Sequence, residues 1–348
     1  MALVDIKSLS LKALELDLKE RLAYPKFRAE QIFAWLTKGV TNFDDMSDLS
    51  KKQREELKKT YYIANAKIGK KLVSKNDGTV KYLFKLNDGE FIESVLMKYH
   101  HGHTICISTQ VGCKMGCKFC ATGLSGFSRN LTPSEMLAQI QSAQSDNNIR
   151  ISNVVLMGMG EPLDNYDNVV SFLKLVSCDE GMNIGNRHIS LSTCGIVNRI
   201  YDLARENFQI TLSVSLHAPN DDIRNKTMPI NQRFNIDELL TACKYYVSKT
   251  GRRISFEYAM INGLNDSDAC AYELAHRLQG MLCHVNLIPV NSSGNKQLDF
   301  KKSTKIRLDA FSKILGKKKI PTTVRRTLGA DINASCGQLR RSETLNRR

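Results

Sequence analysis

Residues 104–120 read TICISTQVGCKMGCKFC, a short β-prone run that leads into a loop carrying Cys113, Cys117 and Cys120. A structural zinc site usually takes four ligands, often as two separated pairs, and the chain offers no second pair of suitable spacing. Iron–sulfur clusters are held by thiolates. Three thiolates can hold three irons of a [4Fe–4S] cluster and leave the fourth iron open. The loop therefore predicts one such cluster rather than a set of inert buried cysteines.

After residues 104–120, predicted strands and helices alternate along the chain. After TICIST, the β-prone runs are NVVLMG, HISLST, QITLSVSL, RISFEYAM and HVNLIPV, and helical stretches begin near Pro133, Asp167, Val197, Ile236, Asp266 and Lys301. Apolar strands that alternate with helices are typical of a parallel sheet covered on both faces. We expect an α/β fold, either a doubly wound sheet or a curved partial barrel, with ligands at the carboxyl ends of the strands.

Two different patterns precede this region. Residues 7–60 predict helices, because apolar residues recur at helical spacing, as in FRAEQIFAWLTK. The runs KKLVSK, VKYLFKL and FIESVLM are separated twice by Asn-Asp-Gly, at residues 76–78 and 87–89. Asn-Asp-Gly is strong turn chemistry, so a small antiparallel meander is expected there.

The charge and composition of the chain indicate which class of partner it binds. The 348-residue chain carries a formal net charge of +15, and its excess of Lys and Arg is concentrated in residues 51–75 and 301–326. Such clusters favour nucleic acid over a membrane surface, although each taken alone could be a solvated face. No secretory signal opens the sequence, and no run approaches the ~20 apolar residues of a membrane span. We expect a cytoplasmic protein whose ten cysteines stay reduced.

The spacing C-x3-C-x2-C at the end of the first of six βα units is the signature of the radical S-adenosylmethionine (SAM) enzymes, which the chain resembles over roughly residues 99–330. The resemblance implies a partial (β/α)6 barrel. It also implies a cluster whose open iron chelates the amino and carboxylate groups of SAM and reduces SAM to methionine and a 5′-deoxyadenosyl radical. A reducing donor such as flavodoxin or ferredoxin would then be a partner.

A narrower resemblance extends over almost the full chain. GFSRNLTPSEM, MGMGEPLDNYDNV, SLHAPND and RRTLGADINASCGQL together resemble the bacterial ribosomal large-subunit methyltransferase N family. That family methylates C2 of adenine in 23S rRNA and in tRNA. Two alternatives stay open: a related C8 methyltransferase that confers antibiotic resistance, and a non-catalytic iron–sulfur RNA-binding protein.

The narrower resemblance also implies roles for three residues. Cys336 matches the methyl-carrying cysteine, Cys106 the cysteine that releases the product by forming a disulfide, and Glu93 the proton acceptor. Each has a plain structural alternative. Cys106 and Cys336 could be ordinary buried thiols, and alternation along FIESVLM taken alone favours a Glu93 that faces solvent.

Residues that contact SAM are implied at the ends of several strands. They are Gly160, Glu161, Ser192, Ser215, Leu216, His217 and Asn291. His217 could otherwise be a core histidine. Five further cysteines match no role, and burial is their better interpretation: Cys178, Cys194, Cys243, Cys270 and Cys283. The expected organisation is a helical RNA-binding module (1–62), a β-hairpin segment (63–98), a barrel (99–331) and a C-terminal segment with Cys336 (332–348).

Overall fold

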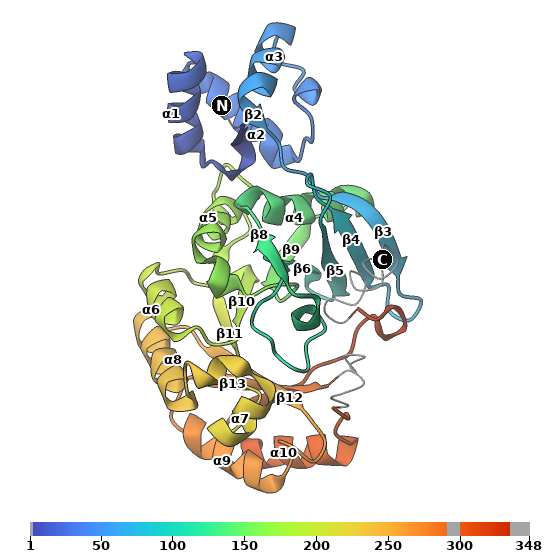
Figure 1. Ribbon diagram of the computed structural model, residues 1–348, viewed down its shortest axis with the longest axis vertical. Coiled ribbons are helices and arrows are strands. Elements are labelled where there is room, and N and C mark those ends of the chain that lie inside the picture. Colours follow the sequence, from blue (N-terminus) through green and yellow to red (C-terminus); the bar gives the residue numbers. More distant parts are fainter. Residues whose placement is uncertain (1–2, 291–299, 335–348) are drawn as a thin grey trace.

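A computed structural model describes residues 3–290 and 300–334. Its centre is a curved ten-stranded sheet in the order β14-β13-β12-β11-β10-β9-β6-β5-β4-β3 (Figure 1). Neighbouring strands run parallel from β6 to β14. These strands are β6 (Gly102–Cys106), β9 (Ile151–Leu156), β10 (Ile189–Thr193), β11 (Thr211–Ser215), β12 (Ile254–Met260), β13 (Cys283–Pro289) and β14 (Thr322–Val324).

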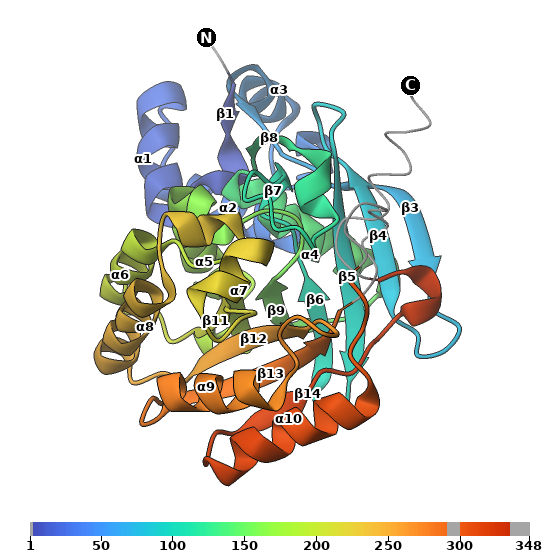
Figure 2. The same ribbon diagram turned by 60° about the horizontal axis from the view of Figure 1, so that its bottom comes forward.

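Helices connect the parallel strands. They are α4 (Pro133–Asn147), α5 (Tyr166–Ser177), α6 (Val197–Arg205), α7 (Asp221–Thr227), α8 (Ile236–Thr250), α9 (Asp268–Leu278) and α10 (Lys305–Lys317). Most of them lie around the outside of the curved sheet, whereas the short α7 lies at the carboxyl ends of the strands, where its Thr227 carbonyl accepts from the Lys118 N–H (Figure 2). The expectation of six βα units in a partial barrel is confirmed. Within the barrel, α7 and β14 were not predicted, because seven and three residues are too few to show a period.

Capping hydrogen bonds mark the starts of two long helices at the positions that the sequence predicted. At α4, the Thr132 hydroxyl accepts from the Glu135 N–H while the Glu135 carboxylate accepts from the Thr132 N–H, and Pro133 occupies the first turn. Asn235 and Glu238 form the same reciprocal cap at α8. Each cap satisfies N–H groups that a helix start leaves without partners.

The expected antiparallel meander is present as β3 (Lys67–Val73), β4 (Val80–Lys85) and β5 (Phe91–Tyr99). Both turns place glycine at a positive φ, 72° at Gly78 and 86° at Gly89. The meander continues the barrel sheet rather than forming a layer of its own, because β5 pairs antiparallel with β6 and brings Val95 opposite Cys106. The hairpin segment therefore supplies part of the barrel wall.

An N-terminal helical module lies at the top in Figure 1. It contains α1 (Leu11–Leu22), α2 (Lys26–Lys38) and α3 (Lys51–Thr60), with a short parallel pair of β1 (Val4–Asp5) and β2 (Tyr61–Tyr62). Gln141 of α4 joins the module to the barrel: its side chain accepts from the buried Lys7 ammonium and donates to the carbonyls of Leu36 and Thr37. Among the helices described, none combines the length and apolar composition needed to cross a bilayer.

Candidate active site

A cavity of about 360 Å³ opens at the carboxyl ends of the parallel strands. Four groups of residues supply most of its lining: residues of β5, the three cysteines of the loop after β6, the residues that end β9 to β13, and the chain that follows β14. The lining includes Cys106, Cys113, Cys117, Cys120, Gly158, Gly160, Glu161, Ser192, Cys194, Ser215, His217, Glu257, Arg325, Arg326 and Ala334. The position agrees with that expected for ligands of a parallel α/β sheet.

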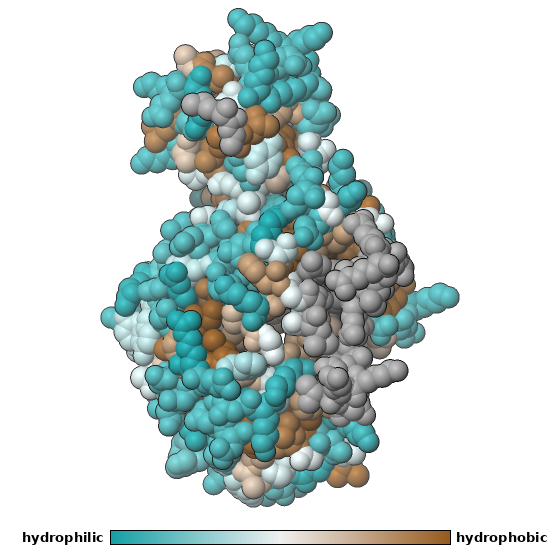
Figure 3. Space-filling model, viewed as in Figure 1, coloured by the Kyte–Doolittle hydropathy of each residue, from teal (hydrophilic) through white to brown (hydrophobic). Residues whose placement is uncertain are grey.

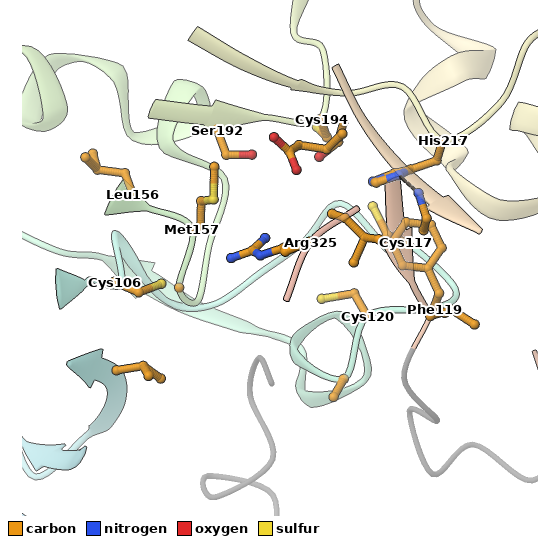
Figure 4. Close-up of a pocket in the computed structure, with 18 of the residues that line it drawn as sticks. Cys106, Cys117, Phe119, Cys120, Leu156, Met157, Ser192, Cys194, His217 and Arg325 are labelled. Atoms are coloured by element: carbon orange, nitrogen blue, oxygen red, sulfur yellow. Dashed lines mark hydrogen bonds between the residues drawn. The ribbon is translucent and has the colours of Figure 1, made fainter. Parts of the chain in front are cut away.

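The cysteine loop is held at its base by a short hairpin of β7 (Gln110–Gly112) and β8 (Phe127–Asn130). Within the loop, the Cys113 N–H donates to the carbonyl of Gly126 and the Cys120 N–H to that of Cys117. Gly116 adopts a φ of 68°, which a residue with a side chain rarely takes. The backbone thus turns tightly enough to direct three thiols into one cavity, where Figure 4 shows Cys117 and Cys120.

The three thiols suit a cluster better than a single ion. Within the described residues, no three His, Cys, Asp or Glu side chains converge closely enough to hold one metal ion. A [4Fe–4S] cluster binds each thiolate on a separate iron, so its ligands need not converge in that way. Burial, with smaller contributions from Glu161 and the neighbouring thiols, raises the pKa of Cys113 to about 12 and also raises that of Cys117. Iron bound there would supply the positive charge that reverses this effect, so the donor set fits the cluster.

The glycines of the loop after β9 pack against the strand that leads into the cysteine loop. A Cβ on Gly158 would lie 2.6 Å from the carbonyl oxygen of Ile107, and one on Gly160 would lie 2.6 Å from Cβ of Gln110. Gly160 also has a φ of 102°. These residues must be glycine because two backbone segments touch there, and this contact fixes the loop at the cavity floor.

Glu161 follows these glycines and is 4% exposed. Its two carboxylate oxygens accept from backbone N–H groups, one from Leu163 at 3.0 Å and one from Cys194 at 2.7 Å. Burial raises the pKa of this carboxyl, and these N–H donors oppose the rise. The carboxylate is thereby fixed in orientation at the cavity wall, with further lone pairs able to accept from a cationic ligand.

His217 is 5% exposed and lies after β11 with a φ of 55°, an uncommon conformation for a side chain of this size. Its Nδ1 accepts from the Ala259 N–H at 2.8 Å, and Phe119 packs edge-on against the ring. Burial and the Arg224 charge lower the pKa of the imidazole to about 3. The ring is therefore neutral, with its proton on Nε2, and acts as a hydrogen-bond donor toward the cavity.

The other residues expected at the SAM site have different positions. Ser192 and Ser215 line the cavity. Leu216 has no exposed surface and is not among the lining residues. Its N–H donates to the backbone carbonyl of Glu257, and its own carbonyl accepts from Arg224. Asn291 lies outside the described residues. The sequence thus identified the correct edge of the sheet and five of the residues that line the cavity there, whereas Leu216 points away from it.

Cys106 ends β6 and lines the cavity, while Cys336 lies outside the described residues. Glu93 is 4% exposed on β5, so the solvent-facing alternative is wrong. It shares a face of the sheet with Val95, the residue opposite Cys106. The Lys81 ammonium, itself 1% exposed, lies 3.7 Å from its carboxylate and donates to the carbonyl of Asn333.

Two residues near the thiols had no role in the sequence prediction. Cys194 is buried as expected, yet it lines the cavity and its N–H orients Glu161. Arg224 has no exposed surface, and its guanidinium donates to the carbonyls of Cys194, Ser215 and Leu216 and to Asn231. It joins the ends of β10 and β11. In the sequence, only the SLHAPND motif indicated that this region belongs to the site. The motif does not show that Arg224, seven residues after His217, packs against the ends of these two strands.

Comparison with known proteins adds independent findings. Residues 107–274 match the radical SAM superfamily, and residues 2–63 match the ribosomal RNA large subunit methyltransferase N-terminal domain. The chain is 54% identical over 344 residues to a Clostridium tetani protein named "Probable dual-specificity RNA methyltransferase RlmN", covering 99% of this chain and 97% of the relative.

An equally named protein of Alkaliphilus oremlandii is 54% identical over 346 residues, covering 99% of this chain and 100% of that protein. Among solved structures, a radical SAM methyltransferase from Sphaerobacter thermophilus superposes with a TM-score of 0.90 at 44% identity. That match covers 96% of this chain and 98% of the other.

Proposed function

The chain belongs to the RlmN family of radical SAM RNA methyltransferases, and from this premise we propose that it methylates C2 of adenine in 23S rRNA and in tRNA in the cytoplasm. One observation carries the proposal: the three-cysteine loop, the polar strand ends and Cys106 all meet at a single cavity. A flavodoxin or ferredoxin as the reducing partner belongs to the same proposal.

Different residues of the cavity would bind the cluster and the different groups of SAM. Cys113, Cys117 and Cys120 would hold a [4Fe–4S] cluster, which supplies one-electron reduction of SAM when it is bound. The fixed carboxylate of Glu161 suits the SAM ammonium. The hydroxyls of Ser192 and Ser215 and the Nε2–H of His217 suit its oxygens and ring nitrogens.

A route through protein cysteines follows from the chemistry of the base. Adenine C2 is an electron-poor ring carbon without a lone pair to attack a sulfonium methyl group, so direct polar transfer should fail. In the proposed route, Cys336 carries the methyl group to C2, Glu93 accepts the proton lost there, and Cys106 releases the product. Ala334 lines the cavity and precedes Cys336 by two residues in the sequence, which supports this assignment.

The release step conserves atoms and electrons. The Cys106 thiolate attacks Sγ of Cys336, the S–S bond forms, and the bond between that sulfur and the methylene carbon breaks. The electron pair of the broken bond goes to the carbon, which takes up a proton and becomes the methyl group. A dithiol reductant of the cell then returns the disulfide to two thiols.

The position of the new methyl group tests the function. The anaerobically reconstituted protein, supplied with SAM, a reductant and an rRNA fragment or tRNA, is expected to give 2-methyladenosine, identified by mass spectrometry and proton NMR. A methyl group at C8 would replace the proposal with the related resistance activity. A protein that binds RNA but releases neither deoxyadenosine nor S-adenosylhomocysteine would be a non-catalytic binder.

The basic runs provide a separate prediction about substrate binding. Hydrophilic side chains cover the α3 end of the N-terminal module (Figure 3), where Lys51, Lys52 and Lys59 are exposed. Changing these three to Gln is expected to weaken RNA binding broadly. The plot of log K against log salt should become less steep by about 0.7–0.9 for each phosphate group that the variant no longer neutralises. Fluorescence anisotropy across a salt series measures the slope.

A matched variant removes the same charge elsewhere. Lys174, Lys244 and Lys249 are exposed on α5 and α8, and changing these three to Gln is expected to leave the slope nearly unchanged. Equal slopes for the two triple variants would show that α3 is only a solvated face.

A further inference from the structure

Arg325 places a positive charge inside the cavity. The residue directly follows β14, and its N–H donates to the carbonyl of Leu287 at 2.9 Å, which anchors its backbone to β13. Figure 4 shows its side chain between Cys106 on one side and Cys117 and Cys120 on the other. Within residues 3–290 and 300–334, the guanidinium forms no hydrogen bond or ion pair. A cation held in this way is available for an anion that arises in the cavity.

The surroundings of Cys106 are otherwise mostly apolar. Val95 of β5 lies opposite Cys106, with Met97 on the same face of that strand, and Figure 4 shows Leu156 and Met157 on the same side of the cavity as Cys106. Two charged groups act on the thiol. From β5, Glu93 opposes ionisation of the thiol and is itself paired with Lys81 of β4; from the chain after β14, Arg325 favours ionisation.

Burial has a larger effect on the ionisation of Cys106 than either of these charges. Desolvation raises the pKa of the Cys106 thiol to about 11, while Arg325 and a backbone hydrogen bond from Met157 lower it in part. At neutral pH the thiol is therefore mostly protonated. Only the thiolate attacks sulfur, so the rate of any reaction at Cys106 follows the small ionised fraction.

We propose that Arg325 is a positioning residue that stabilises the thiolate of Cys106 for product release. The inference rests on the proposed function, in which that thiolate forms the disulfide with Cys336. The guanidinium neither bonds to the RNA base nor takes up a proton. It offsets part of the loss of hydration of a negative sulfur at the mostly apolar end of the cavity.

Alkylation of Cys106 across a pH series tests the inference without needing turnover. Iodoacetamide is uncharged, so its approach does not depend on the arginine charge, and mass spectrometry of the Cys106 peptide measures the rate. In the reconstituted protein, Arg325→Ala is expected to slow alkylation at about pH 9 by roughly three- to tenfold and to move the midpoint of the rate profile to higher pH. Because the smaller side chain opens the cavity, a loss of access cannot produce this slowing.

Two variants serve as controls. Arg326 lines the same cavity one residue further on, and Arg326→Ala, which removes the same charge, is expected to stay within about twofold of the parent protein. Arg325→Lys keeps the charge and is expected to restore most of the rate. Arg325 is exposed, so these variants should fold, and thermal unfolding midpoints check this.

Three results would overturn the inference. An unchanged pH profile in Arg325→Ala would do so, as would equal shifts in Arg325→Ala and Arg326→Ala. A flatter salt dependence of RNA binding with normal alkylation would make Arg325 a phosphate-binding residue instead. All three leave the proposed methylation standing, whereas normal turnover by a variant without Cys106 would remove the release role of Cys106 whatever Arg325 does.

Discussion

Replacing Cys106 with Ala is expected to leave the protein covalently joined to its RNA substrate. Methylation of Cys336 and addition of its carbon to the base need no second thiol, so both steps proceed in the variant. Release needs the sulfur that the variant lacks, so multiple turnover should fall to background while one adduct per protein accumulates. A denaturing gel would show the adduct as a slowly moving band that nuclease treatment removes.

Two comparisons make this result specific. The double variant Cys106→Ala/Cys336→Ala is expected to show no band, because the carbon donor is gone. Cys178→Ala changes a half-buried cysteine that does not line the cavity and should behave as the parent protein does. An adduct mapped to a residue other than Cys336, or normal turnover without Cys106, would contradict the assignment of the pair.

Removing any one of Cys113, Cys117 and Cys120 is expected to abolish methylation entirely. Two thiolates leave two irons without protein ligands, and iron–sulfur clusters are usually held by more thiolates than that. Iron analysis and Mössbauer spectra after anaerobic reconstitution should show one [4Fe–4S] cluster in the parent protein and loss of most iron in each variant.

Cys194 is the matched control because its thiol belongs to the same cavity but lies outside the three-cysteine loop. Cys194→Ala is expected to keep the cluster, with any loss of activity arising from disturbance of Glu161. A tetrahedral zinc spectrum in the parent protein, or retention of the cluster by the Cys117 variant, would disprove the iron–sulfur assignment.

The sequence predicted the barrel well because the necessary signals are local. Apolar runs, helix caps and the spacing of three cysteines each lie within about twenty residues, and all six predicted strands and their helices are present. The pairing of β5 with β6 was not predicted, since local alternation shows that a strand exists but not which neighbour it joins. The domain boundary proposed near residue 98 therefore falls within a continuous sheet.

The candidate site shows the same limit at the level of side chains. Alternation left Glu93 open to solvent. In the structure its buried carboxylate pairs with Lys81, whose ammonium also donates to the carbonyl of Asn333, 240 residues later in the chain than Glu93. Arg224 and Arg325 likewise act on strand ends or thiols that are distant in sequence. Contacts of this kind arise from tertiary packing, which no local spacing encodes.

The continuous ladder from β4 through β5 to β6 also determines how the cavity wall fluctuates. Strands that share backbone hydrogen bonds open together as one cooperative unit, as seen in hydrogen exchange of native proteins. Glu93 and Cys106 lie on adjacent strands of this ladder. We therefore expect their separation to stay nearly constant through ordinary thermal motion, so that parting them requires opening of this part of the sheet.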